Sequence, residues 1–90
     1  MSEILKEAQK EKDRMQQVLD KIKIISSSEK AHDFYDMIRN YFFDGCHFLE
    51  KGKELEAFEA FIICWAYVDA GLKVGFFTVP ASQKEWFTAA

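Results

Sequence analysis

The segment from Ala57 to Phe77 constrains this chain most, because its central run from Ala60 to Val68 carries no charged side chain. Apolar residues in this run point in every direction around a helix axis, and a helix of that kind is buried on most sides. The run is far shorter than the ~20 apolar residues that span a bilayer, so it predicts no membrane anchor. We therefore expect it to form the central helix of a small bundle.

Length and composition limit what can surround this helix. The chain has 90 residues, which predicts a single domain over 1–90, and a domain of this size buries only about 60–65% of its unfolded surface. Nine Phe, two Trp and three Tyr supply apolar area for a small core. The net charge of −3 disfavours nucleic-acid binding, and two Cys without a signal peptide indicate a cytoplasmic location.

Apolar periodicity predicts three helices, near 3–25, 28–51 and 54–73. The first is a surface helix whose charged front half, Lys6–Arg14, offers only Ala8 to a core. We expect that front half to fray or to project from the bundle.

The second helix carries start and stop signals. Ser26 and Glu29 fit a capping box at its start, and Gly52 suits a left-handed residue at its end. The tight turn that follows makes the second and third helices antiparallel neighbours. Two apolar stripes indicate contact with two neighbouring helices, one stripe with Phe34, Ile38, Tyr41, Gly45 and Phe48 and the other with Tyr35, Phe42, Cys46 and Leu49.

The expected fold is all-α, an antiparallel three-helix bundle with a short C-terminal tail. Pro80 ends any helix, and Ser82 with Glu85 fits the cap of a last turn that carries Trp86 and Phe87. These two aromatic residues either complete the core or form a ligand cage, and completion of the core is the simpler interpretation. The predicted core contains Phe34, Ile38, Phe42, Leu49, Phe58, Phe61, Ile62 and Trp65.

The second and third helices resemble one tetratricopeptide hairpin, whose pattern is W-x-x-L-G-x-x-Y followed by A-x-x-x-F. Small residues at Gly45 and Ala57 let the two helices approach closely, and the chain has no second repeat. The matching residues are Tyr41-x-x-Asp44-Gly45-x-x-Phe48 and Ala57-x-x-x-Phe61.

A second resemblance covers most of the chain. It rests on Phe48–Gly52, Ala57–Ala60, Trp65 and Asp69–Gly71, which in order and spacing resemble a small archaeal family grouped only as a domain of unknown function. The resemblance implies a three-helix bundle in an archaeal, cytoplasmic protein. It brings no established activity with it.

Few polar residues are candidates for chemistry. Asp44, Cys46, His47 and Cys64 are potential metal ligands, but adjacent helix positions point about 100° apart and no C-x-x-C is present, so we expect buried thiols, no metal and no cofactor. Asp69 is an ionisable residue within the apolar zone. It is either a functional acid or a hydrogen-bonded structural carboxylate, and the lack of an evident base favours the structural role.

These observations predict a non-catalytic module for protein–protein interaction or self-association, most simply a homodimer. The alternative is a HEPN-like helical domain that acts on RNA or nucleotides. Against it, seven residues separate Arg39 from His47, whereas RNA-cleaving HEPN domains use R-x(4–6)-H. The candidate interaction surface is Ile63, Tyr67, Phe76, Phe77 and Trp86.

Overall fold

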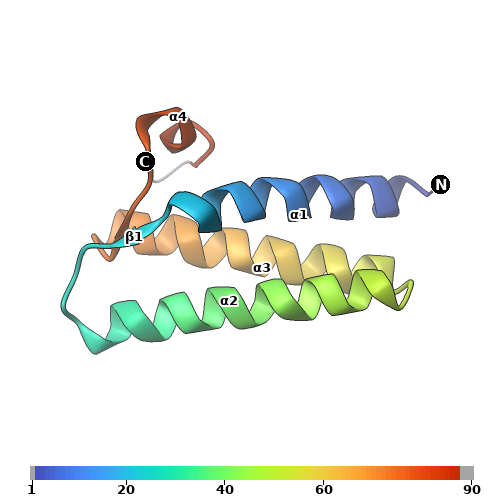
Figure 1. The fold of residues 1–90 in the computed structure, drawn as a ribbon, viewed down its shortest axis with the longest axis horizontal. Helices are drawn as coiled ribbons and strands as arrows, with labels where there is room; N and C mark the ends of the chain where they lie inside the picture. The colour runs from blue at the N-terminus through green and yellow to red at the C-terminus, as the bar shows by residue number, and fades with distance from the viewer. Residues whose placement is uncertain (1, 88–90) are drawn as a thin grey trace.

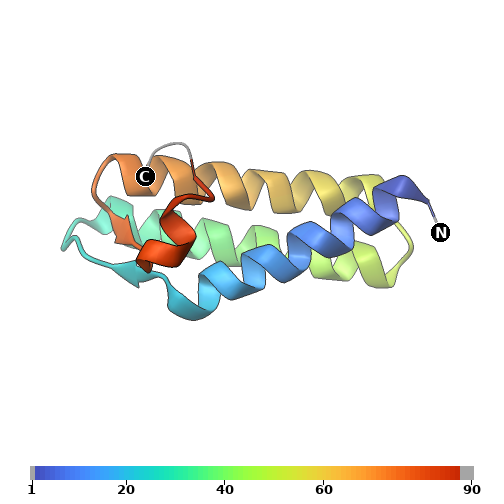
Figure 2. The same ribbon diagram turned by 90° about the horizontal axis from the view of Figure 1, so that it is seen from above.

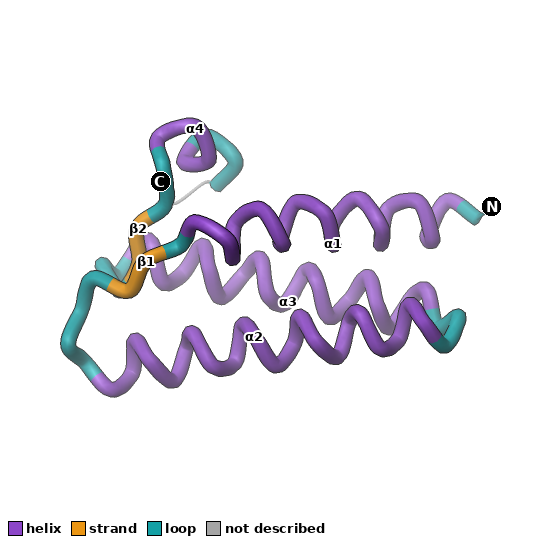
Figure 3. The backbone as a smooth tube through the Cα atoms, viewed as in Figure 1, coloured by secondary structure: helices purple, strands orange, loops and turns teal. Residues whose placement is uncertain are grey.

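The computed structural model describes residues 2–87 and contains three long helices, two short paired strands and a short fourth helix (Figures 1 and 3). This is the all-α three-helix bundle with a C-terminal tail that the sequence predicts. No helix in the described range is long and apolar enough to cross a membrane. The elements are α1 (Glu3–Lys21), β1 (Lys23–Ile24), α2 (Glu29–Glu50), α3 (Glu54–Lys73), β2 (Phe77–Thr78) and α4 (Ala81–Lys84).

The front half of α1 is docked on α3, so the prediction that it frays is wrong. The Ser2 hydroxyl accepts a hydrogen bond from the Leu5 N–H at 3.0 Å and donates one to the Glu54 carboxylate of α3. Ala8 is fully buried and Glu11 is only 8% exposed. The methyl side chain of Ala8 leaves room for the two helices to lie close together, which compensates for the scarcity of larger apolar residues.

The end of α1 also differs from the prediction, because the helix stops at Lys21 and not near residue 25. Lys23–Ile24 is extended and pairs antiparallel with Phe77–Thr78. The Ile25 N–H adds a hydrogen bond to the Phe76 carbonyl at 2.9 Å. Isoleucine is β-branched and favours extended backbone, and the pairing ties the link between α1 and α2 to the tail (Figure 3).

Both α2 and α3 end at a glycine in the left-handed region. Gly52 has φ 73°, as predicted, and its N–H donates to the Leu49 carbonyl at 3.1 Å while the Lys53 N–H donates to the Phe48 carbonyl at 2.8 Å. This pair of bonds is a Schellman motif, which satisfies carbonyls that the helix end would leave open. Gly75, with φ 80°, ends α3 in the same way.

The start of α2 is capped by Ser28, so the assignment of the cap to Ser26 is wrong. The Ser28 hydroxyl accepts from the Lys30 N–H at 3.2 Å. The Ser26 hydroxyl is already engaged, since it accepts from the Ser28 N–H at 3.1 Å within the link that precedes the helix.

The core lies between the three long helices and under the tail. Of the predicted core, Ile38, Phe42 and Phe61 are buried, and the other members pack against them with one exception. That exception is Ile62, which is 41% exposed because it lies ~100° around α3 from the buried Phe61. The largest fully buried side chains are Phe61, Met15, Ile38, Val18, Val68 and Cys64.

Two glycines allow close contact between elements. A Cβ at Gly45 would lie 2.5 Å from Cε1 of Phe61, so the absent side chain lets α2 approach α3, as the sequence suggests. A Cβ at Gly71 would lie 2.3 Å from Cδ2 of Phe77, which lets the tail fold back onto α3.

The tail completes the core. Phe87 is 5% exposed and its ring stacks on Trp65 with 4.3 Å between centroids. The Gln83 side-chain amide donates to the Gln17 carbonyl at 3.0 Å and so fastens α4 to α1. Ser82 lies inside α4, which makes no side-chain cap hydrogen bond, so the predicted Ser82 cap is wrong.

Candidate functional site

Three of the five residues predicted to form an outward patch serve the core of the chain itself. The Phe34 ring meets Tyr67 edge-on at 5.3 Å and Phe76 edge-on at 5.2 Å. Phe77 is 2% exposed, so the expectation that it faces outward is wrong. The reason is that β2 turns its ring onto the bare backbone of Gly71.

The other two residues, Ile63 and Trp86, lie on different elements. Ile63 is 36% exposed on α3. Trp86 follows α4, with its ring 5.9 Å from the Arg14 guanidinium, which also lies 4.4 Å from the Trp65 ring and pairs with Glu11 at 3.1 Å. A cation of the chain itself therefore occupies the space beside the tail aromatics.

The two cysteines are poor nucleophiles near neutral pH. Cys64 is fully buried, its thiol donates to the Ile38 carbonyl at 3.3 Å, and burial raises its pKa to about 12. Burial also raises the pKa of Cys46, with a smaller lowering effect from Lys12 and a raising effect from Glu50. Within residues 2–87, no three or more His, Cys, Asp or Glu side chains are grouped to hold a metal.

The remaining polar candidates lie apart from one another. Asp69 is half-buried on α3. Arg39 and His47 are both exposed on α2, where their spacing separates them by ~12 Å along the helix axis and ~80° around it. The structure therefore does not bring this Arg and His together, and the RNA-acting alternative stays a prediction.

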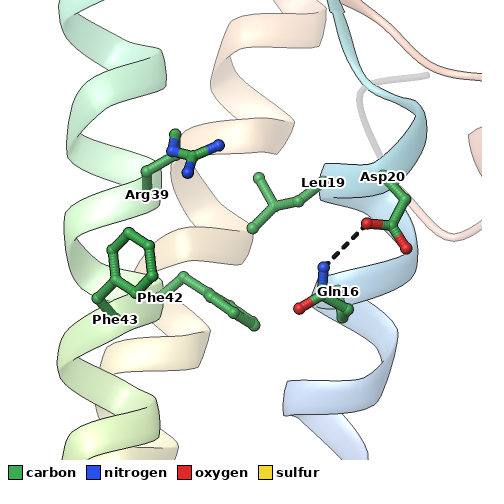
Figure 4. Close-up of a pocket in the computed structure, with 6 residues that line it drawn as sticks. All are labelled: Gln16, Leu19, Asp20, Arg39, Phe42 and Phe43. Carbon is green, nitrogen blue, oxygen red and sulfur yellow. Dashed lines mark hydrogen bonds between the residues drawn. The ribbon is translucent and has the colours of Figure 1, made fainter.

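A groove between α1 and α2 is the feature of this surface with the clearest functional potential. Its first hollow, of about 210 Å³, is lined by Gln16, Leu19, Asp20, Arg39, Phe42 and Phe43 (Figure 4). Its second hollow, of about 440 Å³, is lined by Gln9, Lys12, Asp13, Leu49 and Glu50. We call these side chains together the groove face.

The groove follows from the way in which the helices pack. Both α1 and α2 pack against α3, and Figure 2 shows α1 running obliquely across the other two helices. The sides of α1 and α2 that face each other are therefore not in full contact. On α1 the lining residues recur every three or four positions and form one continuous stripe, whereas on α2 they fall into two groups, Arg39–Phe43 and Leu49–Glu50.

Phe43 is the most exposed aromatic residue of the groove face. Its neighbour Phe42 is 7% exposed and forms part of the floor, whereas Phe43 is 59% exposed at the rim. The Arg39 guanidinium lies 5.7 Å from the Phe43 ring and donates to the Tyr35 hydroxyl at 3.4 Å. Phe43 was not predicted from the sequence, although its position outside both apolar stripes of the second helix was the available signal.

A second apolar area lies where α1 meets α3. Ile4 is 43% exposed, and it lines a hollow of about 130 Å³ together with Phe58. Leu55 and Ile62, which are 51% and 41% exposed, lie one turn before and one turn after Phe58 on α3. We call these four residues the α1–α3 face.

Comparison with known proteins places the chain in a family. A family described as "Protein of unknown function (DUF357)" matches residues 5–77. The chain belongs to the DUF357 family. The crystal structure of a DUF357 protein from Archaeoglobus fulgidus is similar, with a TM-score of 0.75, 29% sequence identity, and coverage of 87% of this chain and 95% of that chain. No curated protein matches.

The family match confirms the resemblance seen in the sequence, and the crystal structure shares the helical bundle. Residues 5–77 include the whole groove face, whereas α4 and Trp86 lie beyond them. The family description assigns no activity, so the surface of this DUF357 protein is the guide to its function.

Proposed function

We propose that this DUF357 protein is a non-catalytic module that associates with a second copy of itself. The observation that supports this most directly is Phe43, which is 59% exposed at the rim of a groove between two helices. An aromatic side chain removes roughly 150–250 Å² from water when it is covered. Burial of Phe43 against another protein surface would therefore contribute favourably to the free energy of association.

The composition of the groove face fits a protein partner. Its apolar side chains lie among charged side chains from both helices and amide side chains from α1; they are Leu19, Phe42, Phe43 and Leu49. Interfaces between separately folded proteins have this composition, with an apolar centre and a polar rim. The hollow beside Phe43, at about 210 Å³, is smaller than the ~300–1,000 Å³ of a typical small-molecule site. The second hollow, at about 440 Å³, lies within that range, but Leu49 is its single apolar lining residue, whereas small-molecule sites are lined mainly by apolar side chains.

The mass of the protein in solution tests the proposal. Sedimentation equilibrium or light scattering at tens of micromolar should give twice the chain mass of 10.5 kDa, with dissociation on dilution. A monomer at every concentration would contradict self-association. That result would favour a groove face that serves another protein.

A further inference from the structure

We infer that the second copy docks on the groove face about a two-fold axis that crosses the helices, so that α1 lies antiparallel to the partner's α1 and α2 antiparallel to the partner's α2. This inference rests on the proposed self-association. It adds which face is used, and in which direction.

The charges on the α1 side of the groove are self-complementary. Lys12 lies four positions before Gln16, and Asp20 lies four positions after it. When two copies of α1 pair antiparallel with their Gln16 residues at the axis, Lys12 of each copy faces the partner's Asp20. One rotation therefore creates two opposite-charge pairs from a single sequence, as an isologous interface requires.

The α2 side repeats this pattern at the same level of the bundle. Arg39 lines the hollow that also contains Asp20, and Glu50 lines the hollow that also contains Lys12. The midpoint of Arg39 and Glu50 along α2 therefore lies beside Gln16. The same axis consequently places Arg39 opposite the partner's Glu50. One rotation therefore forms opposite-charge pairs on both helices.

Most of these charges are not already paired within the chain. Within residues 2–87, the ion pair formed is that of Glu11 with Arg14, which lies outside the groove face. Asp20 accepts a hydrogen bond from Gln16 at 2.9 Å, and a carboxylate has further acceptor capacity (Figure 4). Charges at the rim of a helical interface chiefly set orientation and partner choice, while the apolar centre supplies affinity.

The apolar centre of this arrangement is built around Phe43. Antiparallel pairing of α2 about the same axis brings each Phe43 ring to the level of the partner's Cys46. Cys46 is half-buried in the chain, and Lys12 and Glu50 both act on its pKa. The exposed ring thus meets the Cys46 side chain, with the charges of Lys12 and Glu50 beside it.

The location of the interface is tested by one substitution on each apolar area. Phe43→Glu should abolish the dimer in sedimentation, whereas Ile62→Glu, on the α1–α3 face, should leave it intact. Both positions are exposed in the chain, at 59% and 41%, so both variants should fold, as circular dichroism will show. If the wild type is a dimer and only Ile62→Glu disrupts it, the groove face is wrong while self-association stands. If the wild type is a monomer, self-association itself fails.

The direction is tested by charge reversal and mixing. Arg39→Glu and Glu50→Arg each place like charges at two symmetric positions, so each alone should weaken self-association about tenfold. An equimolar mixture should recover the affinity, because every Glu at 39 or 50 then faces an Arg. A two-fold axis along the helices would instead pair Arg39 with the partner's Asp20 and Glu50 with the partner's Lys12. The mixed dimer would then keep the same number of opposite-charge pairs as each variant dimer, and mixing would give no recovery. Weakening without recovery on mixing would overturn the antiparallel arrangement.

Discussion

Trp65→Ala is the substitution that most directly tests how the three parts of this fold are joined. The Trp65 ring on α3 stacks on Phe87 of the tail at 4.3 Å and lies 4.4 Å from the Arg14 guanidinium of α1. One side chain therefore connects the central helix to the first helix and to the C-terminal segment. Its removal should loosen all three together.

The expected cost follows from these contacts. Truncation of a fully buried aromatic residue to alanine costs about 3–5 kcal/mol, and Trp65 is half-buried, so burial alone suggests the lower end of that range. The stack adds about 0.5–1.5 kcal/mol and the cation–π contact about 0.5–1 kcal/mol, part of which burial already includes. A loss of about 3–4 kcal/mol is therefore expected, from a total of roughly 5–13 kcal/mol for a chain of this length.

Urea unfolding followed by far-UV circular dichroism measures this loss. Tryptophan fluorescence is unsuitable, because the substitution itself removes one of the fluorophores. Trp86→Ala is the matched control, since its ring lies outside the stack and farther, at 5.9 Å, from Arg14. It should cost less than Trp65→Ala. A double-mutant cycle of Trp65→Ala with Arg14→Ala should show coupling of about 0.5–1 kcal/mol. A loss below about 1 kcal/mol for Trp65→Ala would refute its role as a connecting residue.

Three further predictions concern packing and chemistry. Gly45→Ala should lower the free energy of unfolding by about 1–2 kcal/mol although alanine favours helix, because its Cβ would meet the fully buried Phe61 at 2.5 Å; unchanged stability in urea would show that α2 and α3 separate freely. The Cys64 thiol should react with a thiol reagent only on unfolding. Because burial raises the pKa of Cys64 from 9.0 to about 12, the contribution of this thiol to stability is complete below pH 9 and is lost as the pH rises towards 12. Cys64→Ala should therefore lose less stability over this pH range than the wild type, and an equal pH dependence in the two proteins would contradict this. Purified protein should contain no stoichiometric zinc and should not cleave RNA, and cleavage lost in a folded His47→Ala variant would favour the HEPN-like alternative.

The packing arrangement of the three long helices was predictable because it depends on strong local signals in the sequence. Gly52 determines the turn between α2 and α3, and the uncharged run of α3 requires neighbours on more than one side. The end of α1 was not predictable in the same way. Ile25 continues the apolar spacing of the helix, and its extended backbone becomes favourable only when Phe76, distant in sequence, offers a carbonyl. The helical hydrogen bonds that this segment gives up are replaced by pairing with the tail, which no local sequence pattern predicts.

The candidate surface was harder to predict for a geometric reason. Periodicity shows that α3 has apolar residues all round, but it does not show which of them its neighbours and the tail will cover. Tyr67 and Phe76 are engaged by Phe34, and Phe77 by the backbone of Gly71, so most of the expected surplus is used inside the chain. The side chains left exposed depend on helix crossing angles, which side-chain spacing alone does not determine.

The exposed position of Phe43 is therefore a consequence of how the three long helices pack. When two helices pack on a third, the contact between the two is free to vary. Here α1 crosses obliquely (Figure 2), and two hollows lie between α1 and α2. In a bundle whose three helices all packed closely against one another, Phe43 would be covered and the four charged residues of the groove would pair between α1 and α2 within one chain. These residues are Lys12, Asp20, Arg39 and Glu50. In this chain they line two hollows and sit at positions that a two-fold rotation makes complementary. Geometry and charge thus both support the proposal that the groove face of one copy packs against the groove face of a second copy.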